Sequence, residues 1–141
     1  MGEADSKAGL LRRVPLFASL RQRDLEALER LTDVIDRPGG DVLMRQGQTG
    51  NEAFVIIRGG ARVERDGREL AIIGAGDVVG EMALISEGPR VATVTLTEPS
   101  QLLVIGHREF HTLMEDSPEL RRAVFDELGG RIRNLELDHP H

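Results

Sequence analysis

The chain of 141 residues contains no cysteine, tryptophan or tyrosine. Without cysteine it has no disulfide framework, no thiolate metal site and no cysteine nucleophile. Long apolar runs are missing as well. The longest uninterrupted one extends only from Ala53 to Ile57, whereas a membrane-spanning helix needs about 20 apolar residues, so we expect no membrane span. The N-terminal residues MGEADSKAG lack an apolar signal region, and we therefore expect a cytosolic protein.

Positive charges are fewer than negative charges. The chain has 18 Lys and Arg against 24 Asp and Glu, which gives a formal net charge of −6. A nucleic-acid-binding face normally appears as clustered Lys and Arg on a basic domain, so this balance argues against nucleic acid as a partner. A small anionic ligand remains compatible with it, because salt screens the distant net charge while a helix end and an arginine act locally.

Arrangements typical of catalysis or metal binding are missing too. His107 and His111 are four residues apart and could share a helical face, but no third ligand is in register with them. His139 and His141 lie in the tail. We treat all four as surface histidines and expect no metal site. Nothing places an oriented base beside a nucleophile, so we expect a binding module and no enzyme.

The central part of the chain has the period of β-strands. Between Thr32 and Ile105, short β-branched runs alternate with turn signals about every 8–12 residues, as in a barrel or sandwich of short antiparallel strands. The length leaves room for one domain. The runs predict strands near residues 33–37, 41–45, 53–58, 61–65, 69–73, 77–79, 91–97 and 101–105.

Helical patterns flank the strands on the N-terminal side. Residues 1–9 are small and polar and are expected to form a flexible tail. Short helical turns should follow from Leu10, since Pro15 interrupts the apolar pattern. Ser19 with Gln22 resembles a capping box, which predicts a helix over residues 20–31.

The C-terminal side should form a short helix around Phe110 and then a longer amphipathic one that begins at Ser117 and Pro118. Gly129 and Gly130 lie inside the apolar stripe of the second helix, where each costs up to about 1 kcal/mol of helix propensity. This helix is either an ordinary docking helix with a weak point or a hinged one.

Between the sixth and seventh predicted strands lies the most informative stretch, Gly80 to Thr93, which reads GEMALISEGPRVAT. Small and apolar residues after Glu81 can form one helical turn, which ends at Gly88 and Pro89. The first N–H groups of a short helix favour an anion, and a following arginine can bind two phosphate oxygens at once. The stretch is therefore predicted to bind a phosphate. The other interpretation is a β-turn whose Glu81 and Arg90 form only a surface ion pair.

This stretch resembles the phosphate-binding cassette of cyclic nucleotide-binding domains, whose pattern is roughly G-E-x-A-L followed by P-R-x-A-T. The match covers Gly80, Glu81, Ala83, Leu84, Pro89, Arg90, Ala92 and Thr93. The resemblance implies a mainly β fold, an eight-stranded antiparallel, jelly-roll-like β-roll with N-terminal and C-terminal helices. The domain would span residues 10–137, between a tail of residues 1–9 and a tail of residues 138–141.

The resemblance also implies the site. Arg90 would pair with the phosphate oxygens, Glu81 would accept from the ribose 2′-hydroxyl, and the N–H groups of Ala83 and Val91 would add phosphate bonds. Residues of the last helix would cap the base. The ligand-binding set is Val79, Gly80, Glu81, Met82, Ala83, Leu84, Pro89, Arg90, Val91 and Ala92, with base capping by Arg131, Ile132 or Leu135.

Two functions remain open. The first is a cyclic nucleotide receptor that binds cAMP in preference to cGMP, with closure of the last helix as the signal to an effector protein or to a second copy. The preference is expected because Val91 stands where the family often has a hydroxyl when guanine is preferred. The second is an interaction or dimerisation module that keeps the fold with weak or lost nucleotide binding. No bound cofactor is expected beyond the ligand itself.

Overall fold

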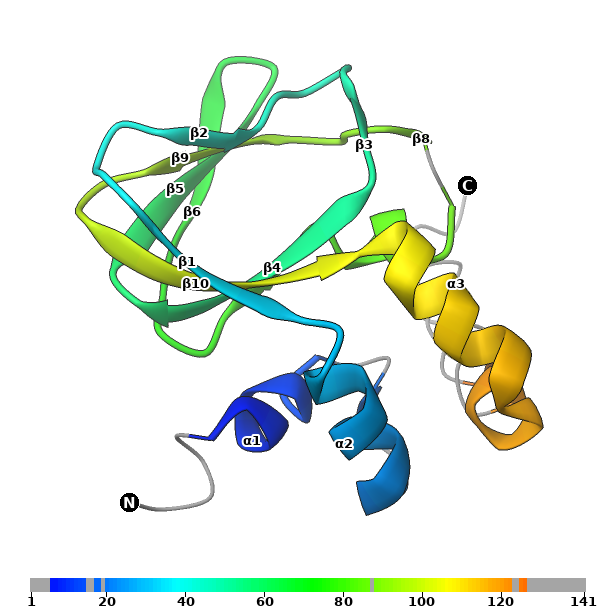
Figure 1. Cartoon of the computed structure of the whole chain (residues 1–141). Coiled ribbons are helices and arrows are strands. Elements are labelled where there is room, and N and C mark those ends of the chain that lie inside the picture. The colour runs from blue at the N-terminus through cyan, green and yellow to red at the C-terminus, as the bar shows by residue number, and fades with distance from the viewer. Residues whose placement is uncertain (1–5, 15–16, 19, 87, 123–124, 127–141) are drawn as a thin grey trace.

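The computed structural model describes residues 6–14, 17–18, 20–86, 88–122 and 125–126 (Figure 1). Ten strands form within this part of the chain. They are β1 (Asp33–Arg37), β2 (Val42–Met44), β3 (Thr49–Gly50), β4 (Glu52–Arg58), β5 (Gly60–Arg65), β6 (Arg68–Gly74), β7 (Val78–Val79), β8 (Gly88–Pro89), β9 (Thr93–Leu96) and β10 (Ser100–Gly106).

The strands form two four-stranded sheets, with the orders β1-β10-β4-β7 and β2-β9-β5-β6, and a small third sheet of β3 and β8. Neighbouring strands are antiparallel throughout these sheets. In Figure 1 the chain passes from one large sheet to the other at the turn between β1 and β2. This arrangement confirms the predicted antiparallel β-roll with flanking helices.

Each of the eight predicted runs contains a strand, and the differences are local. β3 and β8 were not predicted, because two-residue strands of Thr, Gly and Pro carry no periodic signal. β9 begins at Thr93 and not at residue 91. Arg90 and Val91 therefore belong to the connection that enters β9.

β4 explains why the longest apolar run lies where it does. Successive side chains of a strand point to opposite faces. Phe54 and Ile56 pack between the two large sheets, while Ala53 and Val55 pack on the other face against the helices. Both faces of this sheet are thus covered, and the strand has to be apolar along its whole middle.

The N-terminal helices are α1 (Lys7–Leu11) and α2 (Gln22–Glu29), and they lie beneath the roll in Figure 1. α1 begins before residue 10, the expected domain boundary, because the hydroxyl of Ser6 caps it by accepting from the N–H of Gly9. α2 lies within the helix predicted over residues 20–31, and the residue that precedes it is Arg21, which makes no side-chain cap. Ser19 of the predicted capping box lies outside the described residues.

The helix predicted around Phe110 is α3 (His107–Asp116), which extends directly from β10 (Figure 1). Ser117 then accepts from the N–H of Leu120 at 3.2 Å and opens a further helical segment at residues 118–122, as predicted. Gly129, Gly130 and the three predicted base-capping residues, Arg131, Ile132 and Leu135, lie outside the described residues. No helix in the described part of the chain is long and apolar enough to cross a membrane.

Candidate functional site

The predicted helical turn is a single turn of 3-10 helix, η3 (Glu81–Leu84), which follows β7. Gly80 precedes it with φ 76°, in the left-handed region that glycine adopts at little cost. Leu84 is fully buried in the core formed by the helices and the outer face of β4 and β10. This side chain anchors η3 to the body of the domain.

Ala83 differs in detail from its expected role. Its N–H donates to the carbonyl of Gly80 at 3.0 Å. A phosphate that approaches η3 would therefore have to share or replace this bond.

The backbone of Arg90 is held from both sides. Its N–H donates to the carbonyl of Gln48 at 2.8 Å, and its carbonyl accepts from the N–H of Gly47 at 2.8 Å. These bonds extend the pairing of β3 with β8. The position of the arginine is thus fixed by a segment about forty residues earlier in the chain.

The guanidinium of Arg90 is also positioned. Nη2 donates to the backbone carbonyl of Glu52 at 2.8 Å. Two glycines leave room for the group: a Cβ on Gly50 would overlap Nε and Cζ, and a Cβ on Gly80 would lie 2.7 Å from Nη1. The geometry therefore requires small residues at both positions.

Electrostatics at Arg90 act in two directions. Partial burial lowers the pKa of the guanidinium, and the carboxylate of Glu52 raises it. Arginine stays protonated in proteins, so the practical result is a charged, partly desolvated group. Such a group binds an anion more strongly than a fully hydrated one, because the dehydration cost is already met in the free protein.

Glu81 faces the same region. One of its carboxylate oxygens, Oε2, is buried. The side chain lines a cavity of about 370 Å³, within the range of small-molecule sites. Of the predicted residues, this cavity is lined by Gly80, Glu81, Met82, Ala83, Pro89, Arg90 and Val91.

The remaining predicted residues stand behind the cavity. Val79 packs in the core between the sheets, Leu84 packs in the helical core, and Ala92 is buried. They support the wall and do not line it. The wall includes four residues that were not predicted: Met44, Val78, Ser86 and Gly88.

Cavity size alone would not select this site. A larger cavity of about 630 Å³ lies among turns that include Arg58, at the opposite end of β4 from Glu52. The cassette cavity is distinguished by its arginine, which glycines and a backbone carbonyl hold in place.

His107 is a further contact of the cassette. Its Nδ1 lies 2.7 Å from the carbonyl oxygen of Ala83, and its ring lies 4.1 Å from that of His111 between centroids. Both rings are half-buried, so the interpretation of these two as surface histidines is wrong. Nε2 of His111 is buried and has no hydrogen-bond partner among the described residues. Among the residues placed in the structure, no group of three or more His, Asp or Glu side chains is arranged to hold a metal ion.

Comparison with known proteins agrees with this geometry. The sequence profile described as "Cyclic nucleotide-binding domain" matches residues 36–117. The chain belongs to this family. It is 34% identical over 125 residues to a cyclic nucleotide-gated potassium channel of Rhizobium etli, covering 86% of this chain and 35% of the channel. It is 26% identical over 129 residues to a CRP-like cAMP-activated global transcriptional regulator of Mycobacterium tuberculosis, covering 88% of this chain and 58% of the regulator.

Solved structures agree with the fold of this cyclic nucleotide-binding domain. The N-terminal domain of a transcriptional regulator from Streptomyces coelicolor A3(2) superposes with a TM-score of 0.81 at 32% identity, covering 90% of this chain and 92% of that one. The chain spans only about one to three fifths of the length of the curated relatives it matches.

Sequence reasoning missed three contacts of the domain's cassette. Gly50 and Glu52 were not singled out, and His107 was placed on the surface. The spacing of the cassette carries no signal for them, because each reaches the site through tertiary packing.

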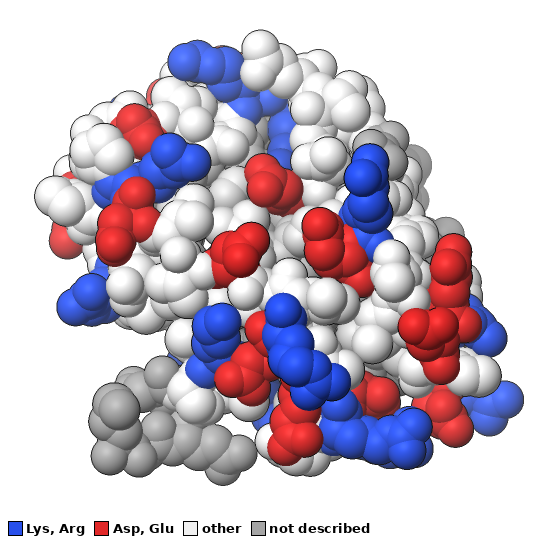
Figure 2. Space-filling view, viewed as in Figure 1, with Lys and Arg blue, Asp and Glu red and all other residues white. Residues whose placement is uncertain are grey.

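On the face drawn in Figure 2, basic and acidic side chains of the described residues are interspersed.

Proposed function

We propose that this domain is a cyclic nucleotide receptor that binds cAMP in preference to cGMP. The observation that carries the proposal is the placement of the Arg90 guanidinium, which the Glu52 carbonyl, Gly50 and Gly80 hold beside the cassette cavity. A preorganised guanidinium loses little freedom when it binds a phosphate. The M. tuberculosis relative, described as cAMP-activated, supports the choice of ligand class.

Two residues would divide the recognition of the ligand. Arg90 would bind the cyclic phosphate with charge-assisted hydrogen bonds. Glu81 would accept from the ribose 2′-hydroxyl, and its partly buried carboxylate supports that role. Because the two side chains line the same cavity, one small ligand can contact both.

Selectivity would come from Val91. Its side chain lines the cavity and is 70% exposed, so it is available to a bound base. It has no hydroxyl to offer the amino group of guanine. That amino group would lose water without replacement, a cost of about 1–3 kcal/mol, which corresponds to roughly 5- to 150-fold in affinity.

The signal would be closure of the C-terminal helix over the base. Gly129 and Gly130 provide the weak point, and aliphatic or arginine side chains such as Arg131, Ile132 or Leu135 would cap the base. A ligand shifts such an equilibrium only through its higher affinity for the closed state. The closed helix would then contact an effector protein or a second copy of the chain.

Calorimetric titration with cAMP and cGMP tests the proposal. We expect saturable binding of both nucleotides, with cAMP bound more tightly. Val91→Thr should reduce the difference in affinity by strengthening the binding of cGMP. Equal or tighter binding of cGMP by the wild type would contradict the preference. Flat titrations with both nucleotides would contradict the receptor and favour an interaction or dimerisation module.

A further inference from the structure

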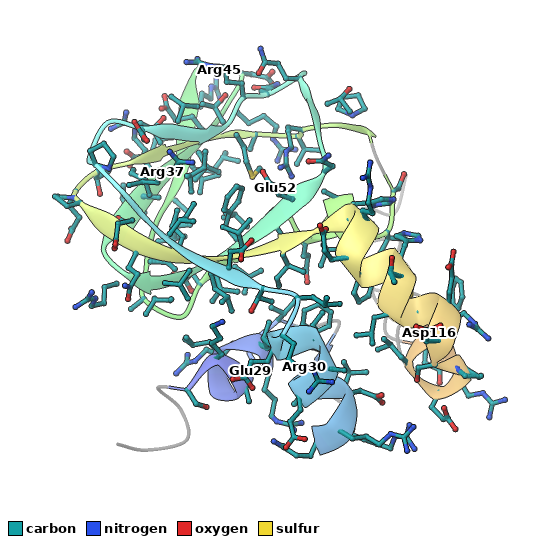
Figure 3. All side chains as sticks on the ribbon, viewed as in Figure 1. Glu29, Arg30, Arg37, Arg45, Glu52 and Asp116 are labelled. Carbon is teal, nitrogen blue, oxygen red and sulfur yellow. The ribbon has the colours of Figure 1, made fainter. Side chains whose placement is uncertain are left out.

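The turn that holds the backbone of Arg90 has no side chain in the core. It covers residues 45–48, between β2 and β3, and one N–H and one carbonyl of this turn bond to the carbonyl and the N–H of Arg90 at 2.8 Å. All of its residues are exposed. A segment with few buried contacts opens easily, so something other than packing has to fix this turn. Figure 3 labels Arg45, its first residue, at the top of the view.

Hydrogen bonds of Gln46 take the place of packing in this turn. Nε2 of its side chain donates to Oδ1 of Asp66 at 2.8 Å, and Oε1 accepts from the N–H of Asp66 at 2.9 Å. The backbone N–H of Gln46 donates to the hydroxyl of Thr93 at 3.0 Å. Gln46 is thus tied to two residues that lie 20 and 47 positions later in the chain.

Thr93 is the last residue of the cassette pattern, and the resemblance gives it no contact with the ligand. It begins β9 and does not line the cassette cavity. Because its hydroxyl accepts from Gln46, the segment from Arg90 to Thr93 is bonded at both ends to the turn of residues 45–48. The hydroxyl therefore has a task within the fold that the spacing of the cassette does not reveal.

Asp66 lies at the tip of the hairpin between β5 and β6. Asp66 and Gly67 have φ values of 54° and 78°, and they join the paired residues Arg65 and Arg68. A two-residue turn with positive φ at both central positions matches the twist of the strands that it connects. β5 also pairs with β9, so the hairpin is part of a larger sheet. The tip is therefore a firm point of attachment for Gln46.

We propose that Thr93, Gln46 and Asp66 form a brace that positions Arg90 for a bound phosphate. None of the three lines the cassette cavity, and they act through the turn of residues 45–48. A turn that is tied on both sides keeps the arginine near its binding position, which lowers the ordering cost of binding. The effect on ligand affinity rests on the proposed function of the cassette, whereas the effect on the turn does not.

Thr93→Val tests the brace, because it removes the hydroxyl and keeps the β-branched shape. In the protein without nucleotide, the amide protons of Gly47 and Arg90 should exchange about three- to tenfold faster than in the wild type, since the turn loses one of its hydrogen bonds. Thr93→Ser keeps a hydroxyl and should exchange like the wild type. Hydrogen exchange followed by NMR measures these rates, and unchanged rates in Thr93→Val would overturn the brace.

Thr95→Val is the matched control. Thr95 lies two positions later on β9 and so shares a face with Thr93. It is also half-buried, and its hydroxyl makes no hydrogen bond to a described residue. The same two amides should exchange at the wild-type rate in this variant. An equal acceleration in Thr93→Val and Thr95→Val would overturn the assignment, because any lost hydroxyl on this face would then loosen the turn.

Gln46→Ala tests the attachment to the hairpin. It removes both side-chain bonds to Asp66 and keeps the backbone N–H that bonds to Thr93, so it should also accelerate the exchange of the Arg90 amide about three- to tenfold. Asp66→Asn keeps an acceptor oxygen and tolerates the positive φ, and it should exchange like the wild type. Unchanged exchange in Gln46→Ala would overturn the part assigned to Gln46 and Asp66.

The position of the guanidinium has its own measurement in the same nucleotide-free samples. The Nε–H resonance of Arg90 should shift in Thr93→Val and in Gln46→Ala and stay fixed in Thr95→Val. A fixed resonance in all three variants would overturn the positioning of Arg90, even where the turn exchanges faster.

Calorimetry with cAMP then measures the consequence for binding. Thr93→Val and Gln46→Ala should each bind about three- to tenfold more weakly than the wild type, because Arg90 is less ordered before binding. Thr93→Ser and Thr95→Val should bind like the wild type. Wild-type affinity in both test variants would overturn the brace as a support of the anion site. A wild type that binds no cAMP would contradict the proposed function, and the exchange rates and the Arg90 resonance would still decide whether the brace exists.

Discussion

Arg90 fills the space that a side chain at Gly50 would need. A Cβ built on Gly50 overlaps Nε and Cζ of the guanidinium and lies 2.6 Å from Nη2. Gly50 does not have a positive φ, so the requirement for glycine is steric and does not come from its own backbone conformation. The end of β3 thereby shapes the anion site.

The first prediction concerns Gly50→Ala. The new methyl group should push the guanidinium away from the Glu52 carbonyl and weaken cAMP binding about tenfold or more, since the group is no longer preorganised. Stability should change little, because the displaced atoms are the end of a flexible side chain. Calorimetry and thermal unfolding measure the two effects.

Gly74→Ala is the matched control for this substitution. Its Cβ would meet only the Gly59 carbonyl oxygen at 3.6 Å, an ordinary contact, and it lies outside the cassette cavity. Its cAMP affinity should equal that of the wild type. An equal loss in Gly50→Ala and Gly74→Ala would mean that the effect is not the displacement of Arg90.

The second prediction concerns Glu81 and the ribose. The wild type should bind cAMP more tightly than its 2′-deoxy analogue by about 1–3 kcal/mol, because the analogue leaves a buried acceptor without its hydroxyl donor. Glu81→Gln should shrink this difference. Competition titration with both ligands measures it, and equal affinity of the wild type for the two would rule out the role.

The third prediction concerns the bond between His107 and Ala83. The Ala83 carbonyl can only accept, so Nδ1 of His107 must carry the proton. His107→Asn can keep a donor near that position and should bind cAMP within about threefold of the wild type. His107→Asp presents only acceptors, which should loosen η3 and weaken binding by about 1–3 kcal/mol. Calorimetry measures the cAMP affinity of both variants, and amide exchange in η3 measures whether that turn is loosened. Equal affinities of the two variants would show that the bond does not support the cassette.

The antiparallel roll could be predicted from sequence because its turns are local. Strand periodicity and Gly-rich turns located eight of the ten described strands, and the spacing of the cassette located Gly80, Glu81 and Arg90. β4 also followed from its composition, since a sheet covered on both faces needs an apolar run such as Ala53 to Ile57.

The features of the fold and the site that sequence could not predict depend on contacts between segments distant along the chain. β3 and β8 exist only because Thr49 and Gly50 meet Pro89 and Gly88 across the fold. The support that Gly50 and Glu52 give to Arg90 is equally invisible along the chain.

The central claim is that Arg90 anchors a cyclic nucleotide, and calorimetric titration of cAMP into the wild type, Arg90→Lys and Arg90→Ala tests it most directly. Removing the guanidinium should cost about 2–5 kcal/mol, or roughly thirtyfold to several thousandfold in affinity. Arg90→Lys should recover only part of this, because a point charge cannot bind two phosphate oxygens in the same geometry. Arg65→Ala, which removes an exposed arginine outside the cassette, should bind like the wild type. Binding by Arg90→Ala within about a factor of two of the wild type would contradict the account.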